Sequence, residues 1–188
     1  AEGLFAGCTG IEQITIPDTV TVIESGAFGG CINLKEIVVP DNVTEIQSSA
    51  FEYCSSLKTV KLSENLERIG VYAFGDCDVL KSIKIPDSVL DIDGAAFAEC
   101  KELSDVVLSK NLKTMGWQVF GNDNKLTEIE IPKSLEECRY YRNNDSIDGG
   151  TFDNCANLKT VMFEDGTTEI AEGLFAGCTG IEQITIPD

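Results

Sequence analysis

The chain has 188 residues, with 32 acidic and 14 basic side chains, eight cysteines and no histidine. A single domain is the prior expectation at this length, and the formal net charge of −18 disfavours a partner such as nucleic acid or an anionic membrane, because such partners need a clustered basic surface. No apolar run approaches the ~20 residues of a membrane span, and no signal peptide is recognisable at the N-terminus. The absence of histidine excludes Ser-His-Asp and Cys-His catalytic pairs and histidine-based metal sites.

An internal repeat dominates the sequence. Phenylalanine recurs in steps of 23 residues, with one step of 32, at Phe5, Phe28, Phe51, Phe74, Phe97, Phe120, Phe152 and Phe175. A cysteine follows each phenylalanine after three residues, except in the sixth unit, where Asp123 takes its place. Three residues further on comes leucine or isoleucine, and then a stretch that alternates apolar and polar residues, as in Val60-Lys61-Leu62. Such alternation predicts one half-buried strand per unit.

A unit of 23 residues carries about eight inward positions, too few for a closed core, so the units must stack into a solenoid. The spacing Leu34-x-x-Ile37-x-Val39-x-x-Asn42 follows the leucine-rich repeat pattern. The last position of this pattern holds residues that can bond the backbone of a turn: Thr19, Asn42, Asn65, Ser88, Asn111 and Ser134.

The strings IPDTVTVIESGAFGGCINLKEI and IPDSVLDIDGAAFAECKELSDV resemble the BspA-like leucine-rich repeat family of cell-surface proteins. The resemblance extends over residues 1–188 and implies a single leucine-rich repeat solenoid of the α/β class. We expect parallel strands on a concave face, with short second strands and short helical turns on the convex side. The resemblance also implies an extracellular or cell-surface, non-enzymatic protein that adheres to host matrix or to other cells, without a cofactor.

The step of 32 marks an insertion of nine residues, which the sequence places at 136–144. It contains Arg139, Tyr140, Tyr141 and Arg142, residue types that are enriched in binding hot spots. Insertions in a solenoid form loops that often lie on a binding face, so these four residues are candidate ligand contacts. The alternative is a tolerated surface excursion whose tyrosines pack on the solenoid.

A second candidate contact surface is a group of four lysines on two adjacent units: Lys58, Lys61, Lys81 and Lys84. Stacked like charges repel unless an acidic group neutralises them, so this cluster is a candidate site for an acidic segment of a partner protein. Alternatively, Glu36, Asp105 and Glu130 on flanking strands supply the neutralisation.

The repeated cysteines invite a disulfide or metal interpretation. Each thiol has a neighbour on both sides, and no C-x-x-C motif is present, so we expect a buried column of free thiols without zinc. Cys138 lies outside this column and is predicted to be either a reactive loop thiol or a partly buried, inert one. An acidic column on the turns, at Asp18, Asp41, Glu64 and Asp87, is predicted to be either a solvated edge or a weak calcium site.

Residues 1–18, AEGLFAGCTGIEQITIPD, recur letter for letter as residues 171–188. The offset of 170 residues suggests a segment of a longer array with that super-period, although an artificial duplication would also produce identical ends. Three functions remain open at this stage. The first is a structural and adhesive array or filament that associates end to end. The second is a discrete receptor for a host or matrix ligand. The third is an accessory region of a secreted enzyme.

Overall fold

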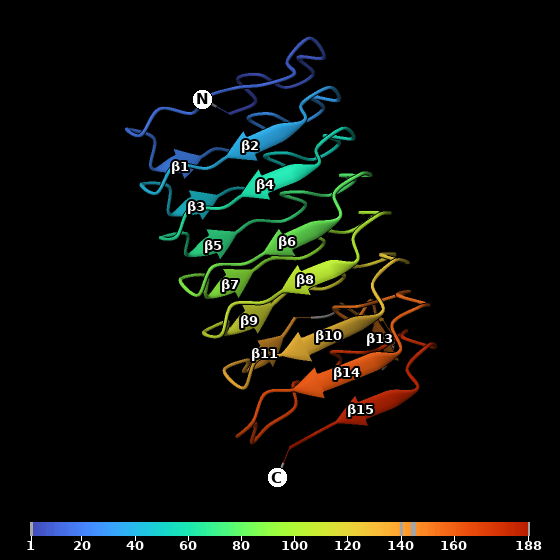
Figure 1. Ribbon diagram of the computed structural model, residues 1–188. Helices are drawn as coiled ribbons and strands as arrows, with labels where there is room; N and C mark the ends of the chain where they lie inside the picture. Colours follow the sequence, from blue (N-terminus) through green and yellow to red (C-terminus); the bar gives the residue numbers. More distant parts are fainter. Residues whose placement is uncertain (1, 140, 144–145, 188) are drawn as a thin grey trace.

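A computed structural model describes residues 2–139, 141–143 and 146–187, with the side chains of 141–148 left outside the description. The chain coils into a stack of similar turns, with the N-terminus at one end and the C-terminus at the other (Figure 1). Each turn from the second onwards contributes a strand to one face, and most turns contribute a second, shorter strand to another face. The predicted solenoid of parallel strands is therefore confirmed.

The longer strands define what we call the long-strand face. They are β2 (Glu36–Val38), β4 (Thr59–Lys61), β6 (Ser82–Lys84), β8 (Asp105–Val107), β10 (Glu128–Ile131), β14 (Thr160–Phe163) and β15 (Gln183–Thr185). They belong to three sheets, β2-β4, β6-β8 and β10-β14-β15, within which equivalent residues pair in parallel, as Ile37 does with Val60. Across the insertion the register is kept, because Ile129 pairs with Val161. In β2 the middle residue is buried and its neighbours are exposed, as the alternating pattern predicted.

The shorter strands form one parallel sheet on another side of the stack. Its members are β1 (Val22–Ile23), β3 (Glu45–Ile46), β5 (Arg68–Ile69), β7 (Asp91–Ile92), β9 (Thr114–Met115) and β11 (Glu137–Cys138). In each of these strands the second residue is buried. The predicted second strands of the units are thus present.

The repeated phenylalanines form a continuous stack through the core. From Phe5 to Phe175, consecutive ring centroids lie 5.1–5.6 Å apart with interplanar angles of 3–19°. Seven of the cysteines form a parallel column of free thiols, which is buried from Cys31 to Cys155, whereas Cys8 at one end is exposed and Cys178 at the other is half-buried. Each buried thiol donates to the carbonyl oxygen of a phenylalanine in the preceding unit, for example from Cys54 Sγ to Phe28 O at 3.3 Å. The predicted thiol column is therefore confirmed and has a hydrogen-bonding role between units.

The expected helical turns are not found, since the described residues contain strands and turns but no helix. The reason is visible around Phe51, which lies between Ser49 with a φ of 57° and Tyr53 with a φ of 60°. Left-handed residues on both sides interrupt a right-handed helix. The same arrangement recurs around Phe74, where Tyr72 and Asp76 have positive φ. The phenylalanine segments are consequently tight turns, and the α/β class is not supported.

The insertion begins later than the predicted boundary of 136–144. Glu137 and Cys138 form β11 and pair with β9, so they continue the regular unit. The amide of Arg139 donates to Met115 O, as the amide of Gly116 donates to Ile92 O one sheet position earlier in the stack. The extra residues follow Arg139 and include an antiparallel hairpin of β12 (Tyr141–Asn143) and β13 (Ser146–Asp148). Cys138 is 5% exposed, and burial raises its pKa to about 11, which identifies it as the inert thiol of the two alternatives.

Candidate binding surface

The four predicted lysines lie together on the long-strand face. Lys61 ends β4 and Lys84 ends β6, while Lys58 and Lys81 each precede the same strands by one residue. Lys61 and Lys84 point outwards because alternate residues of a strand point to the same side, and Lys58 and Lys81, which lie just before the strands, are exposed as well. We call these four residues the lysine patch; their role as ligand contacts remains a prediction.

The four lysines of the patch lack ion-pair partners in the part of the chain that the structure describes. Among the described residues, no ion pair joins Lys58, Lys61, Lys81 or Lys84 to an acidic side chain. By contrast, Lys35 in the preceding unit lies 2.6 Å from Glu12. The flanking acids Glu36 and Asp105 align in register with Thr59 and Ser82, not with the lysines. The patch thus retains four unpaired ammonium groups on a molecule of net charge −18.

Two hydroxyl groups complete the patch, and the sequence analysis missed them. Thr59 and Ser82 are exposed and stand between the lysines of their own units. Both belong to the short motif Lys-[Thr/Ser]-[Val/Ile]-Lys, which recurs at an interval of 23 residues at 58–61 and 81–84. This recurrence was the signal that could have identified them. Neither hydroxyl bonds to another group in the described part of the chain, so both are available as donors.

Apolar side chains border the lysine patch on both sides along the stack. Val38 of β2 is 59% exposed and pairs in register with Lys61, and Val107 of β8 is 50% exposed and pairs with Lys84. A partner segment laid across the strands would therefore meet an apolar side chain, two basic rows and a second apolar side chain. Such a surface can recognise carboxylates by charge-assisted hydrogen bonds and hold flanking apolar residues by burial.

The second predicted cluster consists of Arg139, Tyr140, Tyr141 and Arg142, and the structure describes the side chain of Arg139 alone among them. Arg139 belongs to the regular unit, and its guanidinium bonds to Asp93 at 3.0 Å and approaches Asp91 at 3.4 Å. Arg68 bonds to the other carboxylate oxygen of Asp93 at 2.6 Å. Tyr140 and the side chains of Tyr141 and Arg142 lie outside the described residues. Their role as ligand contacts remains a prediction, and the structure shows Arg139 engaged in an ion-pair network on the short-strand side.

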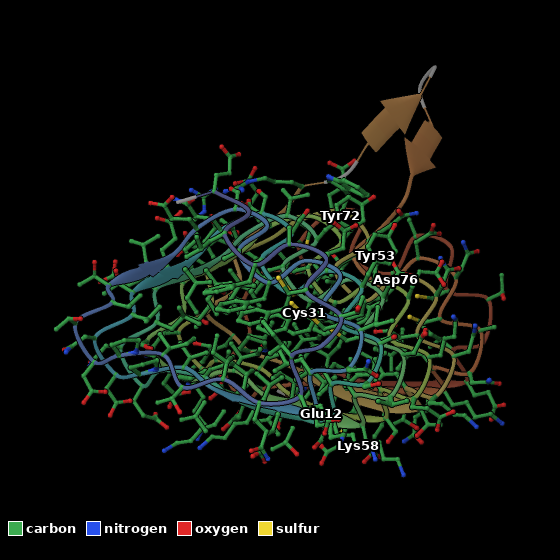
Figure 2. All side chains as sticks on the ribbon, turned by 90° about the horizontal axis from the view of Figure 1, so that it is seen from above. Glu12, Cys31, Tyr53, Lys58, Tyr72 and Asp76 are labelled. Carbon is green, nitrogen blue, oxygen red and sulfur yellow. The ribbon has the colours of Figure 1, made fainter. Side chains whose placement is uncertain are left out.

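The two candidate surfaces do not come together. The hairpin projects from the solenoid on the side opposite Lys58 (Figure 2). A single compact ligand therefore does not contact the lysine patch and the hairpin at once.

Two residues of the acidic column, Asp41 and Asp87, accept hydrogen bonds from the backbone of the next unit. Oδ1 of Asp87 accepts the amide of Lys110 at 3.0 Å, and Oδ1 of Asp41 accepts the amide of Glu64 at 3.4 Å. These carboxylates bond to the turn of the next unit. In the described ranges, no group of three metal-ligating side chains is found. Nor does any described segment form a helix that could cross a lipid bilayer.

Comparison with known sequences gives a family match along the whole chain. The model of the BspA type leucine-rich repeat region matches six copies, over residues 1–89, 23–147 and 134–188. The comparison with curated proteins gives no match.

Solved structures of leucine-rich repeat proteins are similar to this chain. One from Bacteroides ovatus is 30% identical, with a TM-score of 0.68, over 97% of this chain and 56% of its own length. The Treponema pallidum leucine-rich repeat protein is 29% identical, with a TM-score of 0.65, over 79% of this chain and 70% of its own. A leucine-rich cell surface protein from Faecalibacterium prausnitzii shares the fold at 24% identity and a TM-score of 0.54, over 97% of this chain and 61% of its own. The chain therefore spans just over half the length of the first of these proteins.

Proposed function

Because this chain belongs to the BspA-type leucine-rich repeat family, we propose that it is a non-enzymatic adhesive protein of the cell surface or extracellular space that binds an acidic segment of another protein through its lysine patch. The partner class is a host matrix or cell-surface protein. The cell-surface description of the Faecalibacterium prausnitzii relative supports the proposed location.

The observation that carries the proposal is the local reversal of charge. The molecule has 32 acidic side chains, and yet four exposed lysines with no internal partner share two adjacent units. Their mutual repulsion destabilises the empty surface, and a bound carboxylate-rich segment relieves it. Elsewhere on the solenoid, lysines such as Lys35 and Lys113 pair with an acid of a neighbouring unit. Lys110 and Lys125 also have no ion-pair partner among the described residues, so what distinguishes the patch is that four such lysines share two adjacent units.

The test is binding of a fluorescent acidic peptide, rich in Asp and Glu with apolar residues interspersed, measured by anisotropy. We expect saturable binding that weakens as salt rises. The variant with Lys61→Glu and Lys84→Glu should bind at least about tenfold more weakly, since each desolvated charge contact contributes on the order of 1 kcal/mol.

The matched control carries the same charge change elsewhere. Lys110→Glu with Lys125→Glu alters two exposed lysines outside the patch and gives an identical net charge. Equal losses in both double variants would show that only overall charge matters and would refute the lysine patch as the site.

In the alternative function, the chain is a discrete receptor that binds its ligand through the hairpin of the insertion. Its projection from the solenoid favours this candidate (Figure 2). Replacing Tyr140 and Tyr141 with alanine should abolish cell adhesion under this alternative. Under the lysine-patch proposal the same variant adheres normally, and the Lys61→Glu, Lys84→Glu variant does not.

A further inference from the structure

The long-strand face presents a row of outward side chains that crosses the lysine patch and continues beyond it. The row takes the last outward position of each strand and consists of Val38, Lys61, Lys84, Val107, Glu130 and Met162. All of these side chains are exposed. The long strands that carry them lie side by side along the stack (Figure 1). The row, which we call the central column, therefore reads apolar, basic, basic, apolar, acidic and apolar.

The distance between units limits what can lie along the central column. Inside the solenoid, the rings of the phenylalanine stack lie 5.1–5.6 Å apart from one unit to the next. An α-helix advances by about 5.4 Å per turn, so a helix laid along the stack presents about one turn to each unit. An extended segment presents a side chain to the same face only every ~6.4–6.8 Å, so it falls out of step with the column within two units.

The arrangement of the four lysines also fits a helix. Lys58 and Lys61 are three residues apart along an extended strand, which is about 10 Å, and this is close to the diameter of a helix with its side chains. Lys81 and Lys84 are equally far apart in the next unit. On a helix, side chains at i+3 and i+7 lie on one edge of the contact face, and those at i+4 and i+8 lie on the other. Four acidic residues at these positions can therefore meet the four lysines at once, whereas an extended segment carries one row of side chains on each face.

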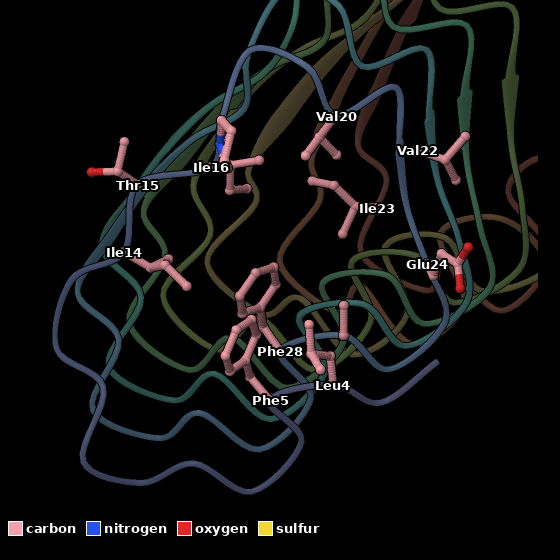
Figure 3. Close-up of a pocket in the computed structure, with 12 residues that line it drawn as sticks. Leu4, Phe5, Ile14, Thr15, Ile16, Val20, Val22, Ile23, Glu24 and Phe28 are labelled. Atoms are coloured by element: carbon pink, nitrogen blue, oxygen red, sulfur yellow. The ribbon is translucent and has the colours of Figure 1, made fainter. Parts of the chain in front are cut away.

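The apolar hollow at the first unit does not offer this combination. It has a volume of about 400 Å³ and is lined by residues such as Phe5, Ile14 and Phe28 (Figure 3). The described residues that line it include no basic side chain. On the long-strand face, by contrast, unpaired lysines lie between exposed apolar side chains at Val38 and Val107. Charge complementarity to an acidic partner therefore favours the long-strand face.

We propose that the lysine patch binds an amphipathic α-helix of the partner protein, which lies along the stack with one turn over each unit. This inference rests on the proposed function and adds the conformation and the sequence pattern of the acidic segment. The helix carries acidic residues at i+3, i+4, i+7 and i+8 over the lysine patch. It carries apolar residues at i, i+11 and i+18, over Val38, Val107 and Met162. At i+14 it carries a basic residue, which lies over Glu130.

The charge pattern also sets the direction of the helix. Acidic residues stabilise the first turns of a helix and basic residues its last turns, because they complement the helix dipole. We therefore expect the N-terminus of the bound helix near Val38 and its C-terminus near Met162. An isolated helix of this length is only marginally stable in water, so the segment should become helical on binding.

The first experiment compares two synthetic peptides of about 22 residues, a length that spans the central column as a helix. The matched peptide carries the proposed pattern, and the control peptide has the same sequence with proline at i+9, which points away from the surface. Proline breaks a helix and leaves every contact residue in place, so fluorescence anisotropy should show at least about tenfold weaker binding of the control. Far-ultraviolet circular dichroism should show a gain of helix when the matched peptide binds. This signal belongs to the peptide, because the described residues of the chain contain no helix.

The second experiment tests the register of one turn per unit with the variant Glu130→Lys. The matched peptide, with lysine at i+14, should bind this variant about threefold more weakly, and a peptide with glutamate at i+14 should regain the affinity. In an extended peptide the residue over Glu130 would be near i+6, because four units span about 20–22 Å. Glu67→Lys is the matched control, since it makes the same charge change at an exposed residue beside β5.

The outcomes separate this inference from the proposed function. Regained affinity with glutamate at i+6 in place of i+14, without a gain of helix, would overturn the helix and leave the lysine patch as a site for an extended acidic segment. Equal losses in Glu67→Lys and Glu130→Lys would show that only net charge matters and would also overturn the register. If neither the matched peptide nor its proline control bound to the chain, the proposed function would fail together with this inference.

Discussion

Arg139 Nη1 lies 3.0 Å from Oδ1 of Asp93, although 46 residues separate them in the chain. The intervening unit places Gly116 at the equivalent position, as the shared pattern of backbone hydrogen bonds shows. Because Gly116 has no side chain, the guanidinium can pass over it to reach Asp93. A Cβ on Gly116 would lie 2.2 Å from Gly94 N, so no other residue fits there without displacement of the backbone.

This contact predicts that Arg139→Met weakens the short-strand sheet where the hairpin leaves it. The side chain of Arg139 is 44% exposed, so we expect a loss of only about 1 kcal/mol in the free energy of unfolding. High salt should reduce the difference between the variant and the unaltered chain. Urea denaturation measures both effects, with Lys125→Met, which removes an exposed lysine outside the lysine patch, as the control without a stability change. A loss that is unaffected by salt would contradict an ion-pair role.

The repeat made the strands and the core predictable, because the units have apolar residues at equivalent inward positions, with Asp123 as an exception. The lysine patch was predictable for the same reason, since equivalent strands of two adjacent units carry the same motif. The tight turns around the phenylalanines were not predictable from the sequence. Ser49 and Tyr53 have no intrinsic preference for the left-handed conformation that the structure requires of them.

The boundary of the insertion was not predictable either. Several alignments of residues 136–147 preserve the apolar frame, and only the pairing of Cys138 with Met115 selects one of them. That choice moves Arg139 from a loop into a sheet and changes its role from a candidate ligand contact to a partner of Asp93. Interactions between side chains two units apart, such as this one, cannot be seen in the sequence of a single unit.

Asp123 predicts a stability that depends on pH. It occupies the sixth position of the thiol column, is fully buried, and has no hydrogen-bond partner for either carboxylate oxygen. Burial, with a smaller contribution from Cys100, raises the pKa of Asp123 well above its usual range. The folded state then binds a proton more tightly than the unfolded state, so this group lowers stability as pH rises from its ordinary pKa towards its raised one.

Asp123→Cys should restore the regular column, in which Cys155 donates to Phe120 O at 2.9 Å. We expect a gain of about 1–3 kcal/mol near neutral pH, because a buried unsatisfied group is removed, and a smaller gain at acidic pH. Asp123→Asn is the control that removes the charge without restoring the thiol, and it should flatten the pH dependence equally. Denaturation midpoints from pH 4 to 8 measure this, and an unchanged slope in both variants would contradict the prediction.

Ser49 predicts a stabilising substitution in a turn. It has a φ of 57°, and its side chain forms no hydrogen bond in the part of the chain described. Glycine adopts this conformation without steric cost and occupies the equivalent position as Gly26 in the preceding unit. Ser49→Gly should raise the free energy of unfolding by about 0.5–1 kcal/mol. Ser48→Gly is the matched control, because Ser48 does not have a positive φ and glycine there should be neutral or destabilising.

At Ser88, a hydrogen bond between units that other units form is missing. Asn65 and Asn111 each donate from Nδ2 to a carbonyl of the preceding unit, at Asp41 O and Asp87 O, both at 2.9 Å. Ser88 occupies the equivalent position with a shorter side chain, and its buried Oγ has no partner. The equivalent acceptor for residue 88 is Glu64 O.

Ser88→Asn should therefore extend the row of asparagine bonds and raise the free energy of unfolding by about 1 kcal/mol. The reverse change, Asn65→Ser, removes one such bond and should lower it by a similar amount. Both appear as opposite shifts of the urea midpoint at constant m-value, because the surface exposed on unfolding does not change. An unchanged midpoint in Ser88→Asn together with a lowered midpoint in Asn65→Ser would contradict the prediction. It would show that the unpaired hydroxyl of Ser88 does not lower stability in a way that asparagine corrects.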